Sequence, residues 1–399
     1  MNLLFVNEIP MNPLFGGIER VTDLLTKELI ARGHNVYYLC TRIDDDSMLD
    51  YEFPVDQLVL PYENGFFNHK NIQYYRKLLE TTKIDVVINQ RGWAPLMNPV
   101  LKLCGVPTIS VIHTIPKGMH IIHMNGILHH NNSFDGFWRY IIKLLIYPLY
   151  YLYKYLRSIK RLKVHYWVLM SNSDAVVLLS QNCKKELDLF TRTLSPKCPT
   201  YSIPNPNTYS ICEFGLTKKE KVLLYVGRMS ANEKNPLRLL KIWKELYQTH
   251  RDWRLIFVGD GDALPNMKTY SLRHKLERVE FAGKQSNVKD YYVKSDFICL
   301  TSNFEGWGLT LTEGMSFGCI PVTFNNYGAA SEIIDDQING CLIPPFNLKT
   351  YAERLSELMN NQILRETMSK AAIEKVETFS VGKVADQWEN LFTQVLAQH

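Results

Sequence analysis

The 399-residue chain lacks several features that would place it in a specialised class of protein. Its eight cysteines are scattered, with no C-x-x-C pair and no Cys/His spacing typical of zinc sites, which favours reduced, buried thiols in a cytoplasmic protein. Hydrophobic residues make up 46% and charged residues 21%, close to the averages of globular chains, so disorder, collagen and coiled coil are disfavoured. The net charge of +5 is too mild to require a polyanionic partner.

The sequence also has no hydrophobic run of the roughly 18 residues that a membrane span needs. The nearest run, 141–153, is interrupted by Lys143 and Pro148. At the N-terminus an apolar run of only four residues precedes Asn7 and Glu8, which is typical of a first strand and not of a signal peptide. We therefore expect a cytoplasmic protein that touches the inner face of a membrane without crossing it.

Short apolar or β-branched runs alternate with helical patterns along the whole chain, which is typical of parallel βα units. Two groups of five such runs predict two tandem Rossmann-like domains of the α/β class. The expected strands are 3–7, 36–40, 86–89, 108–113 and 175–180 in the first half, and 222–227, 254–259, 279–283, 296–302 and 320–324 in the second.

The division between the two domains is expected within Tyr201–Asn207, where two prolines interrupt any regular element. This predicts domains at 1–203 and 204–379, followed by a C-terminal helix at 380–399 with Ser380 as its N-cap. The apolar face of that helix needs a surface to cover, and the pattern leaves open which domain supplies it.

The segment 303–318 is the most informative one, because it carries two glutamates eight positions apart directly after an expected strand. Gly306 and Gly308 permit a close approach of the backbone, and the N–H groups at the start of the following helix favour an anion such as a diphosphate. At a rise of 1.5 Å per residue, Glu305 and Glu313 stand about 12 Å apart, comparable to the span from sugar to ribose in a nucleotide sugar. Alternatively, both glutamates are ordinary solvated charges.

A second cluster, Arg228 and Lys234, follows the expected strand 222–227. The carboxyl end of a strand is where α/β proteins bind ligands, and two fixed cations there would neutralise a departing diphosphate in place of a metal ion. The alternative is a pair of solvated loop charges.

Together these motifs resemble the donor domain of glycosyltransferase family 4, which has the GT-B fold of two Rossmann-like domains facing across a cleft. The resemblance extends to Gly328-Ala-Ala-Ser-Glu332 in the second half and to Gly16-Gly17-Ile-Glu-Arg20, Ser180 and Ile203-Pro-Asn205 in the first. One departure is the spacing of six positions from Arg228 to Lys234, where many members of the family have five.

The resemblance implies a retaining, metal-independent hexosyltransferase that uses a nucleotide-diphosphate sugar as co-substrate and needs no cofactor. The acceptor would be a saccharide or a lipid-linked saccharide in the synthesis of a surface polysaccharide or glycolipid. By this resemblance, Arg228 and Lys234 bind the diphosphate, Glu305 contacts the sugar, and His113 contacts the sugar or the acceptor and assists proton transfer. Glu313 holds the ribose, and the base lies near Ala282, Gly283 and Lys284. The phosphate site is completed by Gly16 and Gly17 and by the backbone N–H groups of Gly306, Trp307, Gly308 and Leu309.

Some of these residues also have plainer interpretations. The two glycines permit a tight βα turn, and His113 fits a strand-end histidine with a satisfied hydrogen bond. Asp260-Gly-Asp262 resembles the metal-binding pair of the other large glycosyltransferase fold, but tandem Rossmann halves favour a simple turn between strand and helix.

The segment 137–170 contains seven Lys/Arg and no acidic residue, so the rest of the chain carries a net charge of −2. On a helix its leucines and isoleucines (141, 145, 149, 152, 156, 159) form one stripe, while Lys143, Tyr147, Tyr150, Lys154, Arg157 and Arg161 lie opposite. Pro148 splits this helix or starts its longer part. The pattern favours contact with an anionic membrane surface, and the alternative is a core helix with a solvated basic face.

Two other functions also fit parts of the sequence. A dinucleotide-dependent oxidoreductase also suits tandem Rossmann units, but no strand is followed by G-x-G-x-x-G. A nucleic-acid-binding module would use the basic segment, and its binding would fade with salt. We expect a nucleotide-sugar donor and no nucleic acid as partner.

Overall fold

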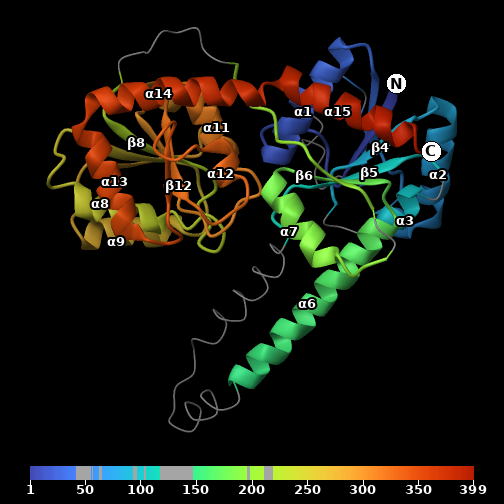
Figure 1. Ribbon diagram of the computed structural model, residues 1–399, viewed down its shortest axis with the longest axis horizontal. Coiled ribbons are helices and arrows are strands. Elements are labelled where there is room, and N and C mark those ends of the chain that lie inside the picture. The colour runs from blue at the N-terminus through green and yellow to red at the C-terminus, as the bar shows by residue number, and fades with distance from the viewer. Residues whose placement is uncertain are drawn as a thin grey trace.

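The computed structural model describes residues 1–41, 55, 57–62, 65–92, 97–102, 105–116, 147–195, 198–210 and 219–399. They form two α/β halves that lie side by side, each with a parallel sheet between helices (Figure 1). This is the GT-B arrangement that the sequence predicted.

The first half is built on a seven-stranded sheet with the order β3-β2-β1-β4-β5-β6-β7, and every pair is parallel. The central strands are buried on both faces, as expected for parallel strands covered by helices. The elements are β1 (Asn2–Asn7), α1 (Gly17–Ala31), β2 (Asn35–Cys40), β3 (Gln57–Val59), η2 (Gly65–Phe67), α2 (His69–Thr82), β4 (Val86–Asn89), α3 (Asn98–Leu101), β5 (Thr108–Ile112), α6 (Tyr147–Ser171), β6 (Ala175–Leu178), α7 (Gln181–Thr191) and β7 (Thr200–Ser202).

The second half contains a six-stranded parallel sheet with the order β10-β9-β8-β11-β12-β13. Its elements are β8 (Val222–Val226), α8 (Leu237–Leu246), β9 (Arg254–Val258), α9 (Leu264–Arg273), β10 (Val279–Gly283), α10 (Lys289–Lys294), β11 (Phe297–Cys299), α11 (Leu309–Met315), β12 (Ile320–Phe324), α12 (Ala330–Ile333), β13 (Cys341–Ile343), α13 (Leu348–Asn360), α14 (Gln362–Val376), η4 (Glu377–Phe379) and α15 (Val381–Leu396).

The strand order reverses between β1 and β4 in the first sheet and between β8 and β11 in the second. At such a switch point the loops leave adjacent strands in opposite directions, which opens a crevice for ligands at the carboxyl ends. The loops that carry most of the predicted site residues follow these strands or their neighbours.

All ten predicted strands are present, and three further strands were missed. These are β3, β7 and β13, each of three residues at or near the end of a sheet. They do not belong to a longer apolar run, unlike the equally short β11, which lies in the run Phe297–Leu300. One of them, β7, includes Tyr201 and Ser202 from the segment expected to divide the domains, and the limits predicted at 203 and 379 stay predictions.

The C-terminal helix α15 packs on the first half, although it follows the second in sequence. Figure 1 shows α14 and α15 running across the top of the molecule from one half to the other. Trp388 and Phe392 are buried in one hydrophobic cluster with Leu3 and Leu25. Ser380 stands at the N-cap position as predicted, but its side chain makes no capping hydrogen bond.

The helix α6 extends away from the first half, beginning at its outer end (Figure 1). Pro148 lies in its first turn, a position that proline tolerates, and residues 137–146 lie outside the described part. Leu152 and Leu156 are 52% and 57% exposed, whereas Leu162, Tyr166 and Leu169 are buried. The core-helix interpretation is therefore wrong for the outer turns. Within the described chain, no helix combines the length and the hydrophobicity that a membrane span requires.

The six cysteines in the described part of the chain are free and buried, in agreement with the sequence analysis. Burial raises the pKa of the Cys319 thiol to about 11. These thiols therefore act as small apolar residues of the core.

Candidate active site

The loops that follow β8 and β9 lie against each other at the carboxyl edge of the second sheet. The Met229 N–H donates to the Asp260 carbonyl at 2.7 Å, and a Cβ at Gly259 would lie 2.0 Å from the Gly227 carbonyl oxygen. Gly259 also has φ +133°, so glycine is required there. The segment Asp260–Asp262 is thus a turn between β9 and α9 that supports the β8 loop.

Lys234 and Glu305, from the two motifs of the second half, form one ion pair. The Lys234 Nζ lies 2.7 Å from Oε1 and 2.6 Å from Oε2 of Glu305, and the Ser302 hydroxyl donates to Oε1 at 2.7 Å. The Asn303 N–H donates to the Glu233 carbonyl at 2.7 Å, which joins the loop after β11 to the loop after β8. Glu305 is buried, so it is not the solvated charge of the alternative interpretation.

Arg228 is the more exposed of the two predicted cations. Its side chain is 65% exposed and forms an ion pair with Glu233 in the same loop. Among the described contacts, Lys234 and not Arg228 reaches Glu305.

Glu313 lies on α11 with a side chain that is only 2% exposed, and its carboxylate accepts three hydrogen bonds. The donors are Arg20 Nη1 at 2.7 Å, the Thr208 hydroxyl at 2.7 Å and the Tyr292 hydroxyl at 2.8 Å. Burial and then the charge of Glu313 hold the pKa of Tyr292 well above its usual value. Burial acts to lower the pKa of Arg20, and the neighbouring carboxylate more than offsets it. Glu313 too is a buried, partnered group.

The two halves touch where the loop after β11 meets the loop after β5. A Cβ at Gly306 would lie 2.0 Å from the His113 carbonyl oxygen, so any other residue would force the backbones apart. A Cβ at Gly17 would lie 2.8 Å from Leu309 Cδ1. The glycine loop of the first half therefore lies beside the start of α11, as a phosphate site shared by two domains requires.

His113 follows β5 and faces Gln90, which follows β4. The His113 Nε2 lies 2.5 Å from the Gln90 Oε1, while Nδ1 is buried without a hydrogen-bond partner in the described structure. Burial, followed by the charge of Arg91, lowers the pKa of His113 to about 4. An amide oxygen only accepts, so Nε2 carries the proton and the Nδ1 lone pair remains able to accept a hydroxyl hydrogen.

The other predicted residues lie at the ends of elements around this region. Gly16 caps α1, Gly308 caps α11, and Ala282 and Gly283 end β10 with Lys284 directly after. The Gly283 carbonyl accepts from the Gly259 N–H at 2.8 Å, so the end of β10 adjoins the loop after β9. Trp307 is buried, with its ring 5.1 Å from that of Phe379.

Sequence reasoning missed the residues that hold the predicted ones in place. They are Gln90 beside His113, Ser302 beside Glu305, and Arg20, Thr208 and Tyr292 around Glu313. Arg20 lies in the motif Gly16-Gly17-Ile-Glu-Arg20, so among these residues it alone had a signal in the sequence. The others are single polar residues without a motif.

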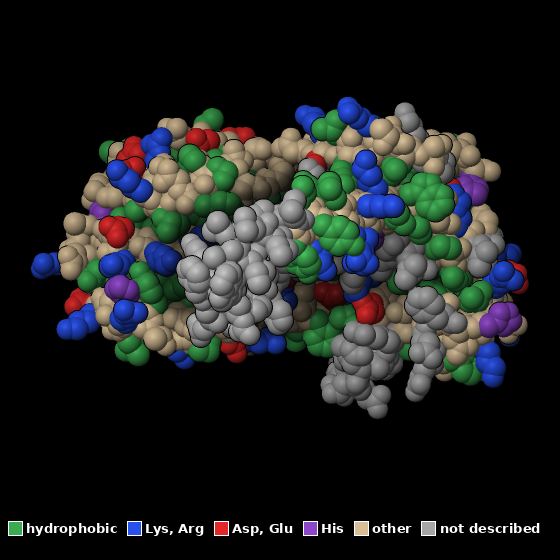
Figure 2. All heavy atoms as spheres, turned by 90° about the horizontal axis from the view of Figure 1, so that it is seen from below, with side chains coloured by type: hydrophobic (Ala, Val, Ile, Leu, Met, Phe, Trp, Pro, Cys, Tyr) green, Lys and Arg blue, Asp and Glu red, His purple; other side chains and the backbone are tan. Residues whose placement is uncertain are grey.

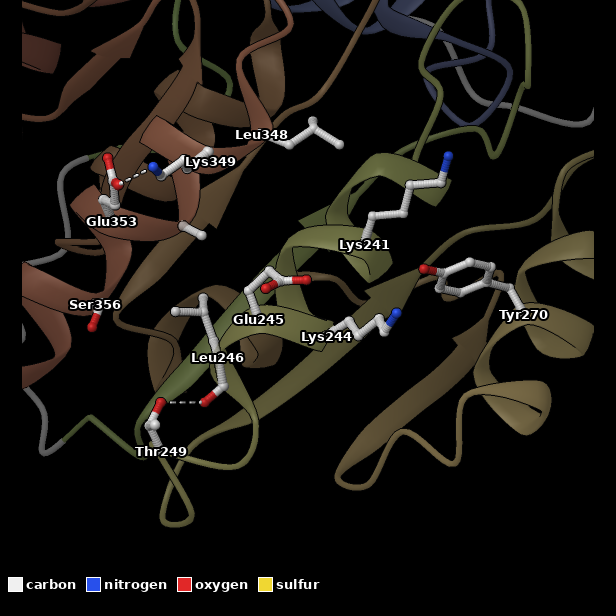
Figure 3. Close-up of a pocket in the computed structure, with 11 residues that line it drawn as sticks. Lys241, Lys244, Glu245, Leu246, Thr249, Tyr270, Leu348, Lys349, Glu353 and Ser356 are labelled. Atoms are coloured by element: carbon white, nitrogen blue, oxygen red, sulfur yellow. Dashed lines mark hydrogen bonds and ion pairs between the residues drawn. The ribbon is translucent and has the colours of Figure 1, made fainter.

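A separate pocket of about 840 Å³ lies on the second half between α8, α9 and α13 (Figure 3). Lys241, Lys244 and Glu245 of α8 line it together with Tyr270 and residues of α13, and Lys349 lies 3.9 Å from Glu353. None of the predicted site residues is among its lining residues. Over the described residues, no group of three or more His, Cys, Asp or Glu side chains is arranged to hold a metal ion.

Two family models together match most of the chain. The model of glycosyl transferases group 1 matches residues 211–375, and that of Glycosyltransferase Family 4 matches residues 15–206.

Individual relatives give the same assignment. An uncharacterized glycosyltransferase of Haemophilus influenzae is 32% identical over 48% of this chain and 54% of its own length. The α-1,4-N-acetyl-D-galactosaminyltransferase of Campylobacter jejuni that acts on GalNAc-α-(1→4)-GalNAc-α-(1→3)-diNAcBac-PP-undecaprenol is 26% identical over 45% of this chain and 49% of its own. The chain thus matches about half the length of these curated relatives.

Among solved structures, Anabaena HepE with UDP and glucose has a TM-score of 0.70 at 16% identity, over 99% of this chain and all of that one. The chain therefore belongs to glycosyltransferase family 4, the group 1 glycosyltransferases, and has their GT-B fold.

Proposed function

We propose that this protein is a retaining, metal-independent glycosyltransferase that transfers a sugar from a nucleotide-diphosphate sugar to a saccharide or lipid-linked acceptor in surface polysaccharide or glycolipid synthesis. The observation that carries the proposal is the ion pair of Lys234 with the buried Glu305, beside the contact of Gly306 with His113. A buried ion pair contributes little net stability, so its place at the carboxyl ends of the strands favours a catalytic role.

In the proposed reaction, the bond between the anomeric carbon and the diphosphate breaks, and the acceptor oxygen bonds to the same face of the sugar. The diphosphate departs with the bonding electron pair and takes up the hydroxyl proton of the acceptor. Lys234 stabilises the negative charge that develops on the diphosphate, and Arg228 adds a second positive charge from the same loop. Glu305 stabilises the positive charge that develops on the sugar.

The remaining residues bind and orient the donor. His113 accepts a sugar or acceptor hydroxyl at Nδ1, the one nitrogen of its ring without a partner in the described structure. Backbone N–H groups of 306–309, together with Gly16 and Gly17, surround the diphosphate. Glu313 holds the ribose, and the base lies near 282–284. HepE, whose structure holds UDP and glucose, and the Campylobacter relative, which acts on a PP-undecaprenol saccharide, support such a donor and acceptor.

The test begins with thermal shifts produced by UDP, GDP, ADP and their sugars, because a ligand at 100 times its Kd stabilises a protein by about 2.7 kcal/mol.

With the donor identified, Glu305→Gln should depress kcat more than donor affinity, and Glu313→Gln should chiefly weaken donor binding. Glu353→Gln, in the separate pocket of Figure 3, is the matched control. EDTA should leave turnover intact. Absence of any donor binding, or full turnover of Glu305→Gln, would refute the proposal.

We also propose that α6 holds the enzyme on the cytoplasmic face of an anionic membrane. Tyr150, Leu152 and Leu156 are exposed on its outer turns, and the basic residues Arg157, Lys160 and Arg161 are exposed as well. Figure 2 looks at the face from which α6 projects and shows hydrophobic and basic side chains next to one another. Apolar side chains that enter the headgroup layer and cations that pair with anionic lipid act together in such helices. A lipid-linked acceptor would be reached from this position.

A further inference from the structure

Arg20 is the residue through which the first half contacts the Glu313 carboxylate. It lies in the first turns of α1, three positions after Gly17, and its Nη1 is 2.7 Å from Glu313 Oε1. Its side chain is 39% exposed, whereas that of Glu313 is 2% exposed. A buried carboxylate without a counter-charge is costly, so Arg20 compensates the charge of Glu313 across the domain boundary.

The Glu313 carboxylate has little capacity left for a ligand. Each carboxylate oxygen has two lone-pair sites, and those of Oε1 are taken by Arg20 and Thr208. Oε2 accepts from Tyr292, which leaves one site. A ribose diol that donates both hydroxyl hydrogens needs two sites, so one present donor must leave.

The three donors differ in how firmly they are held. Tyr292 belongs to the second half and is fully buried, with its ring parallel to that of Phe317 at 5.9 Å. Thr208 directly follows Asn207, whose amide is bonded to Ser316 at the end of α11. Arg20 is carried by the other half and is partly open to solvent. It is therefore the least firmly held of the three donors.

We propose that Arg20 occupies the ribose position in the empty enzyme and is displaced when the ribose binds, so that it competes with the nucleotide while holding the two halves together. This inference rests on the proposed role of Glu313 as the ribose ligand. Nucleotide binding then includes the cost of breaking the pair, and removal of Arg20 removes that cost. The pair also favours a closed arrangement of the halves before any donor is present.

The first test measures the affinity for UDP by titration calorimetry in the wild type, Arg20→Gln and Lys27→Gln. Lys27 lies on the same helix and pairs with Asp23 at 2.9 Å, so its variant removes one charge from α1 while leaving Glu313 alone. Arg20→Gln should bind UDP about fivefold more tightly, and Lys27→Gln should match the wild type. Equal or weaker binding by Arg20→Gln overturns the inference. Glu313→Gln is measured alongside, and unchanged UDP affinity in that variant refutes the ribose role itself.

The second test needs no nucleotide, so it also tests whether Arg20 holds the two halves together if UDP is not the donor. Small-angle X-ray scattering compares the empty wild type with Arg20→Glu and Lys27→Glu, which change the net charge equally. Two carboxylates facing each other should separate the halves in Arg20→Glu and raise the radius of gyration, while Lys27→Glu keeps the wild-type value. Circular dichroism verifies folding, and Arg20→Gln replaces Arg20→Glu if the latter unfolds. An unchanged radius of gyration in the folded variant overturns the inference.

Discussion

At the scale of single residues, Lys234 and Glu305 are each other's main partners. The Lys234 ammonium lies within 2.7 Å of both carboxylate oxygens, and Glu305 is buried. Removing Lys234 leaves the buried Glu305 carboxylate without its counter-charge, which costs more than the intact pair contributes. Their effects on the reaction should therefore be coupled.

We expect Lys234→Gln and Glu305→Gln each to lower kcat about 10²-fold or more, as does the loss of a positioned transition-state donor. The double variant should be little slower than the worse single one, because residues that act as a unit are not additive. Steady-state kinetics with the identified donor measures both effects. Lys244→Gln, on the separate pocket, is the control for loss of a lysine. Multiplicative losses in the double variant would show that the two side chains act independently.

His113 provides a second prediction, on stability. The pKa of His113 in the folded protein is about 4, below the ordinary value of 6.5, because burial disfavours the charged ring. The neutral ring thus favours the folded state above pH 6.5, and this contribution is lost as the pH falls towards 4. Between pH 7 and pH 4 the wild type should lose about 3 kcal/mol of unfolding free energy that His113→Gln does not lose. Urea unfolding at several pH values measures this, and parallel pH profiles for the two proteins would contradict it.

At the scale of elements, α6 and α15 are both amphipathic, but they meet different surroundings. The apolar face of α15 covers the first half, with Val384, Trp388 and Phe392 buried. The outer turns of α6 leave Leu152 and Leu156 uncovered in the described structure. An amphipathic pattern therefore predicts that a helix needs an apolar surface, and the tertiary structure decides whether the protein supplies it.

We expect α6 to bind liposomes that contain phosphatidylglycerol. Each cation near the membrane surface contributes about 1 kcal/mol, so changing Lys154, Arg157, Lys160 and Arg161 to Gln should abolish most of the binding. Flotation at low and high salt measures this effect, and salt should weaken the wild-type binding.

The control for this experiment changes Lys241, Lys244 and Lys349 to Gln, which removes positive charge from the pocket of Figure 3. This variant should float like the wild type. If the α6 variant floats equally well, or the wild type does not float, α6 is a structural helix with a solvated basic face.

At the scale of the whole molecule, the site depends on a close approach of the two halves. Gly306 touches the backbone at His113, and Asn182 of α7 donates from its backbone N–H to Glu332 of α12 at 3.0 Å. Both contacts join loops or helix ends that follow strands of different sheets. The relative placement of the halves is therefore part of the geometry of the proposed site.

Gly306→Ala should keep both halves folded but hold them apart, because the new Cβ would lie 2.0 Å from the His113 carbonyl oxygen. A misplacement of about 1 Å at a catalytic site can lower the rate about 10²-fold, and we expect a loss of that order. Turnover and the radius of gyration are the measurements. Gly382→Ala is the matched control, since its Cβ would lie 3.5 Å from Arg32 Nη2, an ordinary contact. Normal turnover in Gly306→Ala would show that the closed contact is dispensable.

By itself, the sequence determined the fold class, ten of the thirteen described strands and the two motifs of the second half. Buried parallel strands are continuous apolar runs, and a motif such as the one from Glu305 to Glu313 lies within one loop and one helix, so both leave local signals. The short end strands β3, β7 and β13 left none, because they do not belong to a longer apolar run, whereas the equally short β11 lies in the apolar run Phe297–Leu300.

Only the tertiary structure decided which charges are buried partners, which half α15 covers, and that the outer turns of α6 are exposed. Arg20 and Glu313 are 293 positions apart, and Lys234 and Glu305 are 71 apart. Contacts at such separations depend on how two sheets and their loops are placed in space, and no periodicity along the chain encodes that placement. The local pattern thus identified Glu305 and Glu313, while only the fold showed that they pair with Lys234 and Arg20.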